Sequence, residues 1–205
     1  MERNNLNIIN LETPISEEDV RRLKVGDMVT LTGKKIFVIA MTNAAKITLD
    51  SFDKGQPIFD LKDSVIYHCP CGFQKLDGDY RVRWVGATTS MMNEPVTPRL
   101  IELGARVIMG KGGMGKETLR AMQKHGAIYL ATVGAASALL ARGVSRVVKM
   151  IDAKIWLSEL EVKNFGPAIV GMDSHGRDLF EEVMNTARKN VRAFIDPGIN
   201  EQVAK

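Results

Sequence analysis

A glycine-rich segment at residues 110–115 carries the clearest sign of chemistry in the sequence. It reads Gly-Lys-Gly-Gly-Met-Gly and lies between an apolar run and a sequence typical of a helix. Glycines let the backbone approach a ligand, and the free N–H groups at the start of a helix attract anions. Because Lys111 adds a full positive charge, the segment predicts binding of a small anion.

A second candidate is the hydroxyl run Thr88-Thr89-Ser90, which follows a predicted strand at residues 81–85. Hydroxyls on a turn can bind carboxylate oxygens, or they can cap the next helix. Taken alone, the run is better explained as a cap, so it does not identify a site by itself.

A nucleotide site at residues 111–116 is an alternative interpretation of the glycine-rich segment. Lys-Gly-Gly-Met-Gly-Lys resembles the variant phosphate-binding loop of some ATPases, but such a loop needs Ser or Thr after its second Lys to hold Mg²⁺. That residue is Glu117 here, whose carboxylate would repel phosphate. We therefore expect ATP to bind no better than any other anion. A plain glycine-rich turn with a surface lysine is the other alternative.

Two further places offer polar side chains. Asp173 and His175 follow a predicted strand, although a turn before the last helix is the preferred interpretation of that stretch. His68, Cys69 and Cys71 could hold a soft metal ion, but three ligands in one loop are a weak pattern. Inert buried thiols explain the two cysteines better, and we predict no metal ligands in this chain.

The composition is that of one large domain. Of 205 residues, 45% are hydrophobic, which is ample for a core. The formal charge is +4, with dispersed basic residues and only 6% aromatics, so nucleic acid is not an expected partner. No apolar run is long enough to cross a membrane, and we find no signal pattern. With only two cysteines, we expect a reducing, cytoplasmic compartment.

The elements that must position these residues point to an α/β fold. The predicted strands cover residues 28–31, 36–40, 65–68, 81–85, 105–109, 127–132, 144–150, 157–162 and 168–172. The predicted helices start after Ser16 and near Asn43, end near Leu103, and cover residues 118–125, 135–142 and 179–195. A hairpin turn is expected at residues 32–34, another at 77–79, and Pro197-Gly198 should end the last helix.

We thus expect one domain over residues 1–205, with its core from about residue 11 to 196. The strand–helix alternation predicts a mixed sheet with flanking helices and a long C-terminal helix. Antiparallel pairing is expected in the first half of the chain and more parallel pairing in the second.

Several segments, taken in order, resemble the β-subunit of class I iron–sulfur fumarases and L-tartrate dehydratases. They span roughly residues 11–179 and are far more specific together than singly. The segments are Lys24-Val25-Gly26-Asp27, Leu31-Thr32-Gly33, Gly86-Ala87-Thr88-Thr89-Ser90, residues 110–115, Lys163-Asn164-Phe165-Gly166-Pro167 and Asp173-Ser174-His175-Gly176.

The resemblance implies a swivelling β/β/α domain that works beside an α-subunit carrying a [4Fe–4S] cluster. It implies reversible hydration of a dicarboxylate, fumarate/malate first and tartrate second, in an oligomeric enzyme. Lys111 would bind a substrate carboxylate, beside Thr89, Gly112 and Gly113. Thr88 would transfer a proton, a role that needs a strongly tuned environment. We expect the Lys111 ammonium and the Thr88 hydroxyl to face one shared hollow.

The sequence also departs from this family. Where the family has Arg, Asp and His, this chain has Thr42, Asn43 and Lys46, and a second family Arg is Met92. Both bidentate carboxylate clamps are therefore missing, and a lone lysine cannot reproduce an arginine fork. Thr42, Asn43, Asp173 and His175 remain further candidates for the site. The alternative function is a non-catalytic or substrate-shifted relative that binds a small anion.

Overall fold

A computed structural model describes residues 7–134 and 136–203, with side chains of the last helix described through Val191. The strands are β1 Ile8–Glu12, β2 Met28–Ile39, β3 Ser64–Tyr67, β4 Cys71–Leu76, β5 Asp79–Val85, β6 Ala105–Gly110, β7 Ile128–Ala131, β8 Val144–Asp152 and β9 Leu157–Met172. The helices are α1 Glu17–Arg21, α2 Thr42–Asp53, α3 Thr97–Glu102, α4 Lys116–His125, α5 Ser137–Ala141 and α6 Leu179–Val203, with a 3-10 turn η1 at Ser90–Asn93.

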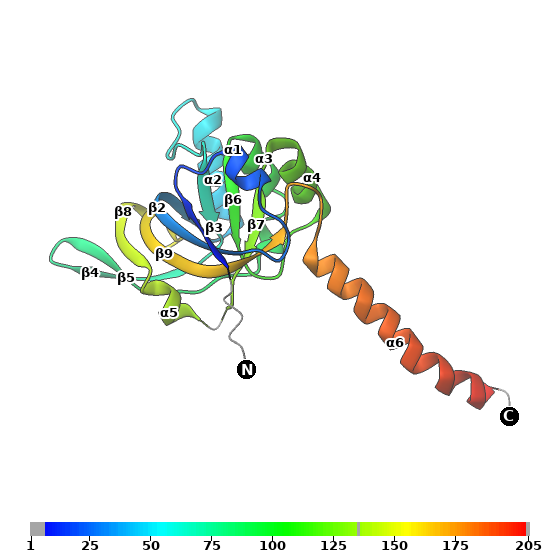
Figure 1. The fold of residues 1–205 in the computed structure, drawn as a ribbon. Coiled ribbons are helices and arrows are strands. Elements are labelled where there is room, and N and C mark those ends of the chain that lie inside the picture. The colour runs from blue at the N-terminus through cyan, green and yellow to red at the C-terminus, as the bar shows by residue number, and fades with distance from the viewer. Residues whose placement is uncertain (1–6, 135, 204–205) are drawn as a thin grey trace.

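A mixed seven-stranded sheet in the order β1-β2-β3-β6-β7-β9-β8 forms the body, and helices flank it (Figure 1). β9 pairs antiparallel with β7 and also with β2, so β2, β3, β6, β7 and β9 close into a barrel. The expected mixed α/β architecture is confirmed. The predicted order of pairing was wrong, because β1, β2, β3, β6 and β7 pair in parallel, whereas the later strands β8 and β9 pair antiparallel. The helices between the early strands provide the crossovers that parallel pairing requires.

β2 is one strand where the sequence predicts two strands and a hairpin turn. Its register against β9 shifts on both sides of Gly33, whose φ is 115°, and Lys35 also has positive φ. Bulges of this kind bend a strand without reversing it, which suits a closing barrel. β9 likewise joins two predicted strands through Gly166.

A separate two-stranded sheet is formed by β4 and β5. The predicted turn at residues 77–79 is confirmed, but it joins β5 to β4 rather than to β3. Sequence pattern missed β4 because most of its residues are only partly buried or exposed, so no apolar alternation marks it.

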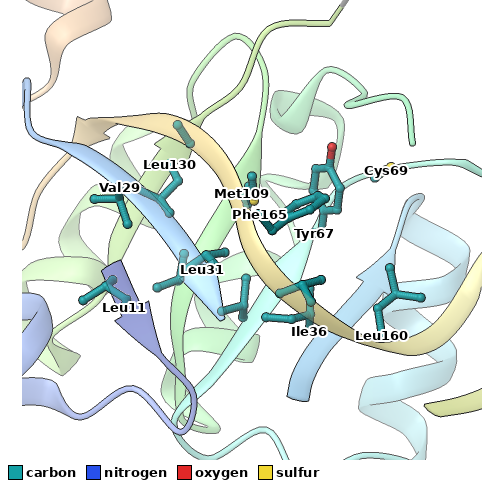
Figure 2. Close-up of a cluster of buried hydrophobic side chains, with 14 of the residues drawn as sticks. Leu11, Val29, Leu31, Ile36, Tyr67, Cys69, Met109, Leu130, Leu160 and Phe165 are labelled. Atoms are coloured by element: carbon teal, nitrogen blue, oxygen red, sulfur yellow. The ribbon is translucent and has the colours of Figure 1, made fainter. Parts of the chain in front are cut away.

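Side chains along each barrel strand point alternately to its two sides, and this divides the core into two layers. Val65 and Tyr67 of β3 face the barrel interior, whereas Ile66 between them packs with residues of α2, α3 and α4. Figure 2 shows part of the interior layer, with Leu11, Val29, Leu31, Ile36, Tyr67, Cys69, Met109, Leu130, Leu160 and Phe165 labelled.

Local signals set several helix ends as predicted. Ser16 and Asp19 form a capping box at α1, and Gly126 ends α4 with a left-handed φ of 65°. The expected cap of α2 by Asn43 was wrong, since its N-cap is Met41 and no side chain caps it.

The long C-terminal helix is confirmed, but its predicted end was wrong. α6 runs past Pro197-Gly198 to Val203 and projects away from the body (Figure 1). A proline inside a helix removes one backbone hydrogen bond and can kink the helix without ending it. Within the described ranges, no helix is both long and apolar enough to cross a bilayer.

Candidate functional site

The site residues meet at the edge where the parallel barrel strands end. β2, β3, β6 and β7 run in the same direction, so the loops after them emerge at one edge of the sheet. Ligands of α/β proteins commonly bind at this carboxyl edge. Thr42 follows β2, Lys111 follows β6, and Thr132 follows β7.

The hydroxyl run joins this edge by pairing with the glycine-rich segment. The Thr88 N–H donates to the His68 carbonyl at 2.9 Å, and the Lys111 N–H donates to the Thr88 carbonyl at 3.2 Å. The Ser90 N–H in turn donates to the Lys111 carbonyl at 3.0 Å, which makes Thr89 and Lys111 a parallel bridge pair. Two segments that lie some twenty residues apart in sequence are thereby held side by side.

This register decides which threonine lies beside Lys111. Bridge partners project to the same face of a sheet and neighbours alternate, so Thr89 shares the face of Lys111 and Thr88 points away from it. A hollow shared by Thr88 and Lys111 stays a prediction. Five hollows on the described surface, including one of about 560 Å³ between β5 and β8, are lined by none of Thr88, Thr89 and Lys111.

The hydroxyls of the run do not act as the cap that the sequence alone favours. Thr89 is the N-cap residue of η1, yet its side chain makes no capping hydrogen bond. Ser90 is buried, and its Oγ accepts a hydrogen bond from the Tyr129 hydroxyl at 3.0 Å. Ser90 therefore anchors the run to β7, and Thr88 and Thr89 remain the two hydroxyls that are at least partly accessible.

Lys111 is exposed and extends toward the loop after β7. A Cβ placed on Gly134 would lie 3.4 Å from its Cδ and 3.7 Å from its Nζ. Gly112 has a positive φ of 83° and is open, because a Cβ placed there would meet only the Thr89 Cγ2, at 4.0 Å. Gly113 has a different role, because a Cβ there would lie 2.7 Å from the Phe180 ring, so it makes room for the start of α6.

The start of α4 is not a free anion site, because Glu94 occupies it. The Glu94 carboxylate accepts hydrogen bonds from the Gly115 N–H at 2.7 Å, the Thr118 N–H at 3.0 Å and the Thr118 hydroxyl at 2.6 Å. These are the donors that a bound phosphate would need. The geometry thus argues against the nucleotide interpretation, and it leaves Lys111 as the anion-binding group of the segment. No local signal links Glu94 to a helix that begins over twenty residues later.

Thr42 and Met92, the two positions where the resemblance expects arginine, lie together. The Thr42 Oγ1 is 2.9 Å from the Met92 carbonyl oxygen and 3.2 Å from the Asn93 Oδ1. Met92 is 56% exposed. Its neighbours Met41 and Met91 are also exposed, at 41% and 46%. Apolar side chains therefore cover this side of the site where a charged clamp was expected.

The other candidates take local roles. Asn43 is exposed, and its Oδ1 accepts from the Ala44 N–H at 2.8 Å. Asp173 accepts from the Val25 N–H at 3.0 Å, and the His175 Nε2 is 3.0 Å from the Arg21 carbonyl oxygen.

Because β9 runs antiparallel, its end lies at the opposite edge of the sheet from Lys111. The structure therefore does not bring Asp173 and His175 into the site, and it confirms their preferred interpretation as a turn.

The segment after β3 is buried and divided between the two core layers. Cys69 and Cys71 are free thiols in the barrel interior with their sulfurs 3.7 Å apart. A hydrogen bond to Cys69, together with burial, raises the pKa of the Cys71 thiol. His68 lies outside that interior layer, and neither ring nitrogen has a hydrogen-bond partner among the described residues. Nowhere in the described part of the chain do three His, Cys, Asp or Glu side chains form a possible metal site.

The buried His68 predicts a pH-dependent stability. Burial lowers its pKa from 6.5 to about 3. The unfolded chain takes up a proton near pH 6.5 and the folded chain does not, so stability present above that pH is lost as the pH falls toward 3. From pH 7.5 to 5.5, His68 should lower the free energy of unfolding by roughly 1.4 kcal/mol.

Urea unfolding of the wild type and of His68→Gln at both pH values measures this effect. The variant should lose less stability on acidification by that amount. Equal losses in the two proteins would show that the folded chain protonates His68 as readily as the unfolded chain does.

The family model described as "Fumarase C-terminus" matches residues 1–183. "Putative fumarate hydratase class I" of Geobacillus stearothermophilus is 36% identical over 198 residues, which are 93% of this chain and 37% of that protein. The chain thus spans only about a third of that relative.

Two shorter relatives match along most of their length. "Putative L(+)-tartrate dehydratase subunit beta" of Methanocaldococcus jannaschii is 39% identical over 190 residues, covering 88% of this chain and 95% of that protein. "L(+)-tartrate dehydratase subunit beta" of Escherichia coli is 32% identical over 178 residues, with 84% and 86% covered.

Proposed function

Because this chain belongs to the fumarase C-terminus family, we propose that it is the β-subunit of a hydro-lyase whose active site is completed by a second chain. The reaction is the reversible hydration or dehydration of a dicarboxylate. Fumarate/malate is the first candidate substrate and tartrate the second, in keeping with the names of its relatives.

The observation that carries this proposal is that the open edge presents too little positive charge to neutralise a dicarboxylate. Lys111 is exposed on it, whereas the nearby Glu94 carboxylate is bound to the start of α4. A dicarboxylate carries two negative charges, and one ammonium neutralises only one of them. We propose that the remaining positive charge comes from another chain.

Exposed apolar side chains at the same edge support a covering partner. They are Met41, Met91, Met92 and Val133, with exposed fractions of 41%, 46%, 56% and 68%. Clustered apolar side chains beside a polar site are typical of a surface that another protein covers.

The cofactor belongs to the partner under this proposal. A cysteine-bound [4Fe–4S] cluster requires more thiolates than this chain has, since the sequence contains two cysteines. Both thiols are buried in the barrel interior. The residues of this chain therefore do not fit a cluster, and we assign it to an α-subunit. The free thiols also suit a reducing compartment, and we propose the cytoplasm.

Each residue of the edge then has one task. Lys111 pairs with a substrate carboxylate, and Gly112 leaves space for that carboxylate to reach the backbone. Thr89, on the face of Lys111, donates a hydrogen bond to the same group. We propose that Thr88 transfers the proton from the other face of the run, to a substrate atom that the partner chain brings there, and its backbone is held from both sides by His68 and Lys111.

A second candidate is a relative that binds a diacid without turning it over, or that acts on a different substrate. The contact of Thr42 with Met92 favours it, because uncharged groups occupy one side of the site. A carboxylate on that side would need a cation from the partner.

Co-expression with a cluster-bearing α-subunit tests the proposal. Anaerobic assays of fumarate, malate and tartrate should show turnover by the complex and none by either chain alone. Turnover by the isolated chain would contradict the shared site. A complex that forms and binds diacids without turnover would support the second candidate.

A further inference from the structure

A hollow of about 560 Å³ is lined by residues of two strands, β5 and β8, that lie beside each other (Figure 1). β8 is the last strand of the seven-stranded sheet, and β5 belongs to the two-stranded sheet that it forms with β4. Each of them therefore has one edge that pairs with no other strand in the described part of the chain. A free strand edge can pair with an added extended segment.

The lining of this hollow is basic. Arg81, Arg83 and Arg146 are exposed there, and Asp79 is the one acid among the described residues that line it. The Glu161 carboxylate pairs with Arg146 at 2.6 Å. Arg81 and Arg83 have no such acidic partner within the described structure, so the β5 side of the hollow keeps free positive charge.

A second basic hollow, of about 420 Å³, adjoins the first. Gly143 lines it and directly precedes β8, and the Lys163 N–H donates to the Gly143 carbonyl at 2.8 Å. Arg142 and Lys163 are exposed in this hollow, and no acid is present among its described lining residues. The two hollows together form a surface that attracts negative charge.

Apolar side chains are interspersed with the arginines of the first hollow. Tyr80 and Val82 alternate with the two arginines along β5, and Val144 and Val147 contribute from β8. All four are partly buried. Because cross-strand neighbours share one face of a sheet, a segment added to β5 would match this lining if acidic and apolar side chains alternate along it. A second copy of this chain would instead set arginine against arginine.

We infer that an extended acidic segment of the cluster-bearing chain binds in the hollow between β5 and β8 and pairs with the free edge of β5. Its acidic side chains lie beside Arg81 and Arg83, and its apolar side chains lie beside Val82. The inference rests on the proposed function, which requires that chain as a partner. The chain leads from Gly134, which lies against the Lys111 side chain, through α5 into β8, so this surface adjoins the open edge.

Charge reversal in the full-length chain tests this binding with the separately purified cluster-bearing chain under anaerobic conditions. Arg81→Glu and Arg83→Glu should each raise the dissociation constant of the two chains about tenfold, because each places like charges side by side. Raising NaCl from roughly 50 to 500 mM should weaken the wild-type complex more than that of the double variant, since salt screens exposed charges. Lys54→Glu is the matched control, because Lys54 is exposed at the end of α2 and lines neither hollow. It should leave the constant unchanged.

Hydrogen exchange of the wild-type complex locates the contact independently, and the amides of β5 should be protected on binding. The inference is overturned if β5 stays unprotected in a complex that forms, if both arginine variants bind as the wild type does, or if Lys54→Glu weakens binding as they do. It is also overturned if the double variant loses affinity for a single-stranded RNA oligomer while its complex with the other chain is unchanged.

Turnover separates this inference from the proposed function. At saturating concentrations of the cluster-bearing chain, kcat of the arginine variants should equal that of the wild type. A complex that forms through β5 and does not turn over contradicts the proposed activity alone. A complex that turns over and is indifferent to the arginine variants contradicts the inference alone, and a wild-type chain that binds no cluster-bearing chain contradicts both.

Discussion

Thr88→Ala is expected to lower kcat/KM of the assembled enzyme by at least about a hundredfold, the usual lower range for loss of a general acid–base group. The decrease should lie in kcat, because the missing hydroxyl acts on the reacting proton and not on the bound carboxylate. Stability should change little, since Thr88 is only half-buried and is held through its backbone. Steady-state kinetics of the complex, with thermal unfolding of each variant, gives both quantities.

Thr88→Ser and Thr89→Ala serve as controls. Serine keeps the hydroxyl and should retain most of the activity. Thr89 shares the face of Lys111, so its alanine variant should raise KM more than it lowers kcat. A larger loss of kcat in Thr89→Ala than in Thr88→Ala would assign the proton transfer to Thr89.

Lys111→Ala is expected to lower kcat/KM by at least about tenfold, at roughly 1.4 kcal/mol per decade. Charge-assisted hydrogen bonds typically contribute roughly 1.5–3 kcal/mol, and loss of this one would leave a substrate carboxylate unpaired. The fold should survive, because Lys111 is exposed and its ammonium makes no hydrogen bond or ion pair within the described structure.

Lys116→Ala is the matched control for charge. Lys116 is the first residue of α4, five residues from Lys111 in the same segment. Its removal should leave kcat/KM within about twofold of the wild type, since a charge outside the site is screened by solvent. Equal effects of the two variants would mean that the segment attracts the substrate only through its net charge.

The sequence by itself determined the features that depend on neighbouring residues. The helix start after Ser16, the glycine end of α4 and the apolar runs of β3, β6 and β7 are local patterns, and the structure has each of them. The nearness of Lys111 to the hydroxyl run was expected only through resemblance, because no local rule relates two segments so far apart. The family assignment came from the order of several such segments.

Only the tertiary structure decided the relations that involve distant residues. Gly33 is a bulge and not a turn because β9 pairs along the whole of β2 and holds it extended. Glu94 occupies the start of α4 because closure of the barrel brings η1 beside it, which removed an anion site that the glycines alone suggested.

The direction of β9 separated the polar candidates in the same way. Asp173 and His175 lie at the opposite edge from Lys111, although all three follow strands in the sequence. Strand ends look alike in a sequence, and only pairing direction assigns them to one edge or the other. The choice of Thr89 over Thr88 as the neighbour of Lys111 has the same origin, because a shift of register by one residue exchanges the two faces of a strand.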